Sequence, residues 1–90
     1  MGFIGIVEYR LILEGFTQVE MPFGAKLLTA RVRRGVPYLC AFIYEANLPE
    51  IRHIRIAQAG EQVNDRVEYI GTFQLSFGGP NYYVFEMLPN

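Results

Sequence analysis

The sequence predicts an all-β fold of about seven antiparallel strands, arranged as a small sandwich or barrel. The main observation is that apolar and polar residues alternate with a period of two along most of the chain. Turn residues, chiefly glycine and proline, recur at short intervals between the alternating segments. No stretch of useful length has the period of an amphipathic helix. With 90 residues, the chain is expected to form one β-rich domain, 1–90.

The first two predicted strands cover residues 7–14 and 16–21. In the first, VEYRLILE alternates in a way that is typical of a half-buried strand. Glu14-Gly15 is a turn signal, and the alternation resumes after it, so the two segments are interpreted as a first hairpin. Pro22 and Gly24 then end the second strand, because proline has no backbone N–H and glycine tolerates positive φ.

The third and fourth predicted strands, 27–33 and 37–45, flank a loop around Gly35. The alternation of the third places Leu28, Ala30 and Val32 on one face, and Leu27, Thr29, Arg31 and Arg33 on the other. The fourth is apolar on both faces, with Leu39, Ala41 and Ile43 opposite Tyr38, Cys40, Phe42 and Tyr44. A strand of this kind is covered on both sides. It is therefore expected to be central in its sheet or to lie in a subunit interface.

Three further strands are predicted at 51–58, 67–76 and 82–88. In the fifth, Ile54 and Ile56 are expected to face the core with Arg52, while His53, Arg55 and Ala57 face outward. Gly71 within the sixth indicates a bulge, a bend or a close backbone approach. Residues 61–68 have room for one short helical turn.

Several chemistries are disfavoured by residue counts. Cys40 is the only cysteine and His53 the only histidine, which rules out an internal disulfide and makes a metal cage improbable. Cys40 lies in the most apolar strand, where a thiol is more often inert packing than a nucleophile. FGGPN lacks the Lys-Ser/Thr of a phosphate-binding loop. We expect no enzyme, no cofactor and no metal.

The charge distribution bears on possible partners. The net charge is −1, which disfavours specific DNA binding and attraction to an anionic membrane. No targeting segment or stretch of transmembrane length stands out, and a lone thiol is typical of a reducing cytoplasm. Locally, however, Lys26 to Arg34 contains four cations and no acid. Any anion site is therefore expected to be local.

The candidate ligand-binding residues are basic and aromatic. Arg31, Arg33 and Arg34 lie together in the predicted third strand and its loop, and guanidinium groups grip phosphates bidentately. His53 and Arg55 share a predicted outward face and are second candidates, while Tyr38 and Tyr44 can stack on a base. The alternative is that these charges form a solvated face that protects a sheet edge. The fourth strand, apolar on both faces in so short a chain, also predicts a homo-oligomer.

Several short motifs follow one another along the chain in the order YRL, MPFGAKLLTARVRRGVPYLCA, IRHIRIA, YIGTFQLSFGG and YYVFE. This order of motifs resembles that of a family of short uncharacterised bacteriophage and prophage proteins. The sequence departs from the family at Met21, where leucine is usual, and at Cys40, where tryptophan is usual. The resemblance implies a phage accessory protein in the host cytoplasm and supplies no catalytic residues.

Three functions follow as hypotheses from the residues and the resemblance together. The first is a non-enzymatic protein that counteracts host defence by sequestering an anionic small molecule, such as a nucleotide signal. The second is an inhibitor or adaptor that binds a host protein. The third is a minor structural or assembly protein of the virion.

Overall fold

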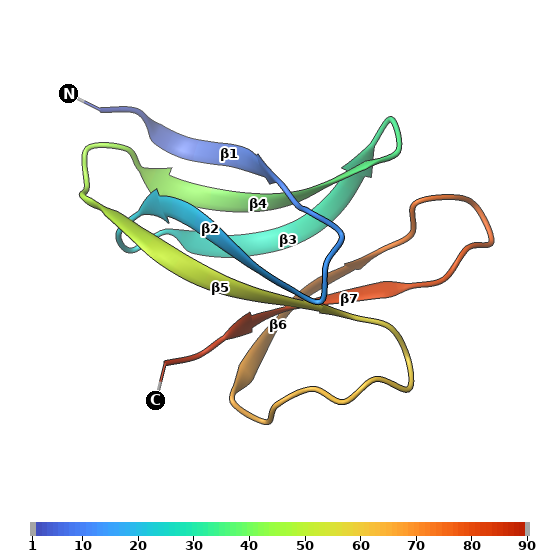
Figure 1. Cartoon of the computed structure of the whole chain (residues 1–90). Helices are drawn as coiled ribbons and strands as arrows, with labels where there is room; N and C mark the ends of the chain where they lie inside the picture. The colour runs from blue at the N-terminus through green and yellow to red at the C-terminus, as the bar shows by residue number, and fades with distance from the viewer. Residues whose placement is uncertain (1, 90) are drawn as a thin grey trace.

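A computed structural model describes residues 2–89 and confirms the all-β prediction (Figure 1). The seven strands are β1 (Ile4–Arg10), β2 (Phe16–Pro22), β3 (Lys26–Arg33), β4 (Val36–Tyr44), β5 (Pro49–Ala57), β6 (Val67–Phe73) and β7 (Tyr82–Met87). Their bounds agree with the predicted segments to within one or two residues, with two exceptions. β1 runs from Ile4 to Arg10 rather than from Val7 to Glu14, and β6 ends at Phe73 rather than Ser76. The short helical turn for which residues 61–68 have room does not form, since these residues are irregular up to the start of β6.

The strands form two antiparallel sheets that pack against each other. The three-stranded sheet has the order β1-β4-β3, and the four-stranded sheet has the order β2-β5-β7-β6. The sheets approach most closely along β3 and β6, and within residues 2–89 they do not close into a barrel. In Figure 1 the three-stranded sheet lies above, and β5, β6 and β7 lie below it.

The predicted first hairpin is wrong. β1 pairs with β4, with Val7 opposite Ala41, and β2 pairs with β5, with Gln18 opposite His53. The two strands therefore belong to different sheets, and the Glu14-Gly15 turn carries the chain from one sheet to the other. Turn residues specify a reversal of the chain, but they do not specify whether the strands on either side pair with each other.

The core lies between the sheets and explains the two-faced apolar strand. Leu39, Ala41 and Ile43 of β4 are buried against the other sheet, where Ile54 and Val84 are fully enclosed. Within its own sheet, β4 pairs with β1 along one edge and with β3 along the other, as expected of a central strand. The outer face of β4 is only partly covered. Phe42 and Tyr44 pack edge to face there at 5.5 Å, and Tyr44 is exposed.

The β3–β4 hairpin turns through Arg34 and Gly35, as predicted. Both residues have positive φ, 51° and 76°, which is the conformation of the tight turn that suits the twist of a hairpin. Earlier in β3 the register shifts between Leu27 and Thr29. This bulge reverses the predicted faces of two leucines: Leu27 packs against the core, and Leu28 is exposed.

Gly71 combines two of the features predicted for it. The β6–β7 register shifts between Tyr69 and Gly71, and a Cβ at Gly71 would lie 2.8 Å from the backbone nitrogen of Ala30. The absence of a side chain therefore lets β6 approach β3, which brings the edges of the two sheets together.

Candidate functional site

The outer face of the three-stranded sheet changes from cationic to apolar along its length. Cross-strand register places Arg10 and Arg31 on either side of Tyr38. Adjacent strands are about 4.8 Å apart, so the two arginines stand roughly 10 Å apart with the tyrosine between them. Towards the other end, Ile6 lies opposite Phe42 and Ile4 lies opposite Tyr44. One sheet face thus carries two surfaces of different chemistry.

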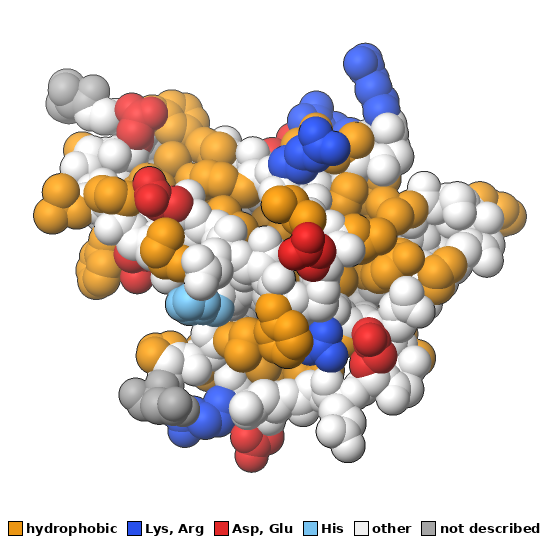
Figure 2. Space-filling view, in the orientation of Figure 1, with side chains coloured by type: hydrophobic (Ala, Val, Ile, Leu, Met, Phe, Trp, Pro, Cys, Tyr) orange, Lys and Arg blue, Asp and Glu red, His pale blue; other side chains and the backbone are white. Residues whose placement is uncertain are grey.

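The hairpin tip adds two more arginines to the cationic end. Arg33 lies opposite Val36 in the last pair of the β3–β4 ladder, and Arg34 is exposed in the turn. With Val36 and Tyr38 they line an open hollow of about 630 Å³. Figure 2 shows basic side chains gathered at the upper right, where Figure 1 places this hairpin. We call Arg10, Arg31, Arg33, Arg34 and Tyr38 the arginine patch.

A single carboxylate lies within the arginine patch. Glu8 contacts Arg33 at 2.5 Å between Oε1 and Nη2, and Arg31 at 3.9 Å between Oε2 and Nη1. Both arginine side chains remain about 60% exposed, so these ion pairs are well screened by water. With Arg10 and Arg34 included, four cations face one anion, and the patch keeps a positive charge.

Tyr38 and Cys40 support the patch from within β4. The Arg33 guanidinium lies over the Tyr38 ring, 4.9 Å from its centroid, so part of the ring that was predicted to stack on a base is already covered. The Cys40 thiol is buried and lies 3.8 Å from Glu8. Burial and the Glu8 charge raise the pKa of this thiol. It therefore stays protonated at neutral pH, where a nucleophile would need to be a thiolate.

The other predicted site residues lie away from the patch. Tyr44 is at the opposite end of β4, beside Ile4. His53 is exposed on β5 of the other sheet, opposite Gln18 of β2. The structure therefore brings together Arg31, Arg33, Arg34 and Tyr38, and separates Tyr44, His53 and Arg55 from them.

Arg55 was expected to face solvent, yet it is 9% exposed. Its guanidinium donates to the carbonyls of Ile56 at 2.8 Å, Gln62 at 2.9 Å and Gly15 at 3.3 Å. It also stacks over the Phe16 ring at 4.7 Å. Ala57, predicted to face outward as well, is buried too. The β1–β2 connection at Gly15, the Phe16 ring of β2 and the connection after β5 cover this face, which makes Arg55 a structural side chain.

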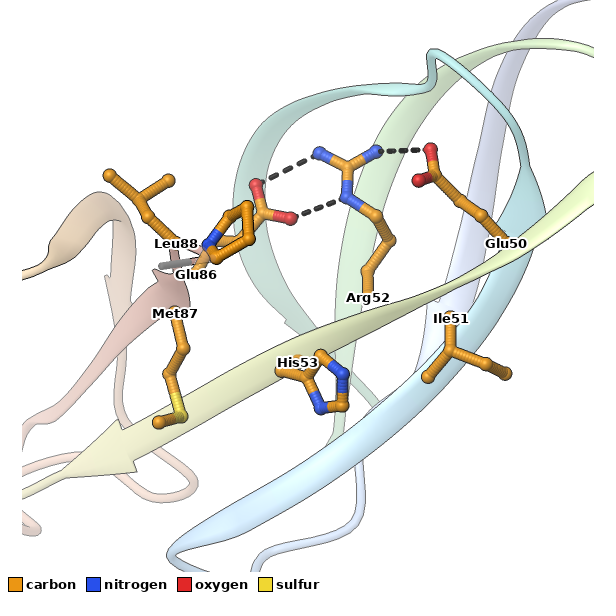
Figure 3. A pocket seen from close by; sticks show the side chains of 8 residues that line it. Glu50, Ile51, Arg52, His53, Glu86, Met87 and Leu88 are labelled. Atoms are coloured by element: carbon orange, nitrogen blue, oxygen red, sulfur yellow. Dashed lines mark hydrogen bonds and ion pairs between the residues drawn. The ribbon is translucent and has the colours of Figure 1, made fainter.

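A second cavity, of about 430 Å³, opens where β5 and the end of β7 diverge (Figure 3). Among the residues that line it is Arg52, which donates to both carboxylate oxygens of Glu86 and to the Ala25 carbonyl at 2.7 Å. Glu50 lies 3.6 Å from the same guanidinium. The Glu86 hydrogen bonds raise the pKa of Arg52, against the opposing effect of burial.

The charge of Arg52 is therefore neutralised within the protein. In Figure 3 the Arg52 side chain points towards Glu86 and Glu50, while His53 extends from the opposite side of β5. Both residues line the cavity, but they leave β5 on opposite faces and Arg52 is already paired, so Arg52 is not available to an anion there.

No group of three or more His, Cys, Asp and Glu side chains within residues 2–89 is arranged to hold a metal ion. Over the same residues, no helix has the length and apolar character needed to cross a membrane.

Residues 5–90 match the model of a domain of unknown function, DUF7352. The chain belongs to the DUF7352 family. The bacteriophage origin implied by the motif resemblance is not part of that match and stays a prediction. No curated protein and no solved structure matches the chain.

Arg10 is the member of the arginine patch that sequence reasoning missed. It lies 21 positions before Arg31 in the chain, and only the pairing of both strands with β4 brings it to Tyr38. The available signal was that Glu8 and Arg10 are two positions apart and therefore share one face of the strand. That signal gives the face of the strand, but not the neighbouring strand.

Proposed function

We propose that this DUF7352 protein is a non-enzymatic binding protein that captures an anionic small molecule at the arginine patch. The observation that carries the proposal is the cross-strand row Arg10–Tyr38–Arg31, with Arg33 and Arg34 directly beside it. Four guanidinium groups around one aromatic ring form a cationic surface in a protein whose net charge is −1. Such groups bind phosphate oxygens through paired N–H donors.

Glu8 sets the kind of anion that fits. It already occupies Arg33 and approaches Arg31, so an incoming ligand has to displace a carboxylate. A ligand with two or more negative charges can do this while also contacting Arg10 and Arg34. The spacing of about 10 Å across the row suits separated phosphates better than a single carboxylate.

The Arg33–Tyr38 stack favours a ligand with a planar group. A base can lie on the exposed side of the Arg33 guanidinium and extend the stack that begins at Tyr38. Together, phosphates and a planar base describe a nucleotide. Sequestering a nucleotide signal in the cytoplasm of a bacterial host would counteract host defence, and the motif resemblance to phage proteins supports that role.

The test is ligand binding by a charge-deleted variant. Calorimetry and thermal shift with linear and cyclic di- and trinucleotides should detect binding to the wild type that weakens as salt is raised. Arg31→Ala/Arg33→Ala should lose about 1–3 kcal/mol of binding free energy per contact removed. Lys26→Ala/Arg66→Ala is the matched control, because it removes two positive charges outside the patch.

An equal loss of binding free energy in the two double variants would mean that the effect comes from net charge alone. Equal affinity of Arg31→Ala/Arg33→Ala and the wild type would show that the ligand does not bind at the arginine patch. Absence of binding to every nucleotide tested would favour a second function, that of a protein-binding adaptor. Its supporting observation is the apolar end of the same sheet face, where Ile4, Ile6 and Tyr44 are exposed.

A further inference from the structure

β1 is an edge strand with an open side. Within residues 2–89, the strand that hydrogen-bonds to it is β4, and the β1–β4 register runs unbroken from Ile4 to Arg10. Figure 1 shows β1 along the upper rim of the molecule. Edge strands of soluble proteins are usually shortened, bulged, or protected by proline or charged side chains. β1 carries two charges, Glu8 and Arg10, but they are of opposite sign and can complement those of a second copy. β1 has seven residues, no proline and no bulge, and two of its isoleucines are more than 60% exposed.

The backbone groups on that open side can be identified from the ends of the ladder. The Leu11 N–H donates to the Pro37 carbonyl at 3.0 Å, and the Glu45 N–H donates to the Phe3 carbonyl at 2.9 Å. Bonded pairs recur at every second residue of an antiparallel ladder, so the odd-numbered residues of β1 bond to β4. Ile4, Ile6, Glu8 and Arg10 therefore direct their N–H and C=O groups towards the open edge.

We propose that a second copy of this chain pairs with that edge through its own β1. The two strands run antiparallel about a two-fold axis, with Tyr9 opposite the partner's Tyr9. Glu8 then lies opposite the partner's Arg10, and Arg10 opposite the partner's Glu8. Ile6 faces the partner's Ile12, which lies two residues beyond the end of β1 and is also exposed. The open groups of Glu8 and Arg10 then form hydrogen bonds between the two strands.

Charge complementarity selects this register over its neighbours. In an antiparallel pair, directly opposed side chains point to the same face of the sheet. The even-numbered residues of β1 point to the outer face, so each of them has to lie opposite an even-numbered residue of the partner strand. With Glu8 on the axis, the two Glu8 carboxylates would oppose each other. With Val7 on the axis, Ile6 would oppose the partner's Glu8, and Ile4 the partner's Arg10. The Tyr9-centred register pairs opposite charges and also pairs isoleucine with isoleucine.

The dimer would be one six-stranded sheet with the order β3-β4-β1-β1-β4-β3. Its outer face would carry two arginine patches side by side near the axis, because Arg10 of each copy lies next to the pairing edge. The inference does not rest on the proposed ligand, since a dimer that binds no anion would still satisfy it. Loss of the dimer and loss of ligand binding are separate measurements.

Sedimentation velocity from low-micromolar to submillimolar concentration is the first test. The wild type should dimerise. Ile6→Lys should weaken the dimer roughly tenfold or more, because it places a charge beside the partner's Ile12. Phe23→Lys is the matched control: Phe23 is 63% exposed against 62% for Ile6, but it lies outside β1. A monomeric wild type, or equal weakening by both variants, would overturn the proposal.

The register is tested by reversing charges. Arg10→Glu should weaken the dimer, because two carboxylates would then oppose each other, and added Glu8→Lys should restore it. Circular dichroism identifies any variant that fails to fold. Dimerisation unaffected by Arg10→Glu would overturn the register.

Amide hydrogen exchange separates edge pairing from stacking of the two sheet faces. The Glu8 and Arg10 amides should be protected at high protein concentration and should exchange at least about tenfold faster in Ile6→Lys. A wild-type dimer in which these two amides exchange freely would contradict edge pairing.

Discussion

The two sheets use arginine in opposite ways. In the four-stranded sheet, Arg52 and Arg55 are largely buried, and their donors are satisfied by Glu86 and by backbone carbonyls. In the three-stranded sheet, Arg31 and Arg33 are largely exposed and share one carboxylate. The first pair holds loops and strands together, and the second remains available to a ligand. A guanidinium is therefore a site candidate only when its donors are not already used within the protein.

Among the variants that test this difference between the two groups of arginines, the largest loss of stability is expected from Glu86→Ala. It leaves the Arg52 charge poorly compensated in a side chain that is 16% exposed. Breaking a buried pair by removing one partner costs about 3 kcal/mol, with Glu50 limiting the loss. Chemical denaturation measures the free energy of unfolding. Glu20→Ala, an exposed acid on β2, is the control, and equal stability of the two variants would show that Arg52 is not a structural anchor.

A somewhat smaller loss is expected from Arg55→Ala. The variant leaves the carbonyls of Ile56 and Gln62 without this donor and exposes the Phe16 ring. Unsatisfied buried polar groups cost about 1–3 kcal/mol. Thermal denaturation should show a lower Tm, with Arg34→Ala as a control in the exposed turn. An unchanged Tm would move Arg55 back among the candidate binding residues.

Alkaline pH should weaken the three-stranded sheet. The pKa values of Cys40 and Tyr9 are raised, mainly by burial, so the folded state holds both protons more tightly than the unfolded state does. Their contribution to stability is complete below the ordinary values, 9.0 for the thiol and 10.0 for the phenol, and is lost as pH rises through the folded-state pKa.

Denaturation curves recorded across this range should show stability falling, and the fall should be shallower in Cys40→Ala. A slope that is unchanged in that variant would mean that the thiol does not take part.

The smallest effect on stability is expected from Arg31→Ala/Arg33→Ala. Exposed ion pairs contribute about 0–1 kcal/mol, so the free energy of unfolding should hardly change. The same denaturation assay checks this value. A loss as large as that of Glu86→Ala would remove the difference between the two groups of arginines and make the patch structural.

The sequence was sufficient to predict where the strands lie along the chain, but not which strands pair with each other. Period-two alternation located seven strands, and the arginine-glycine turn was predicted with its position. The bulge at Leu28 reversed two side chains, because one inserted residue changes the face of those before it. Arg10 was missed, and Arg55 was wrongly expected to face solvent, for a related reason. Alternation gives the face of a strand, but the neighbouring strands and loops determine what lies over that face.

The pairing of β1 with β4 and of β2 with β5 also sets how the chain folds. Val7 meets Ala41, and Gln18 meets His53, across long loops of chain that have to close before either ladder can form. The β3–β4 and β6–β7 hairpins join strands that are adjacent in sequence, and we expect them to form first. β4 therefore spends part of the folding time with an unpaired side. During synthesis, β1 leaves the ribosome before β4 does, and it stays unpaired until β4 emerges.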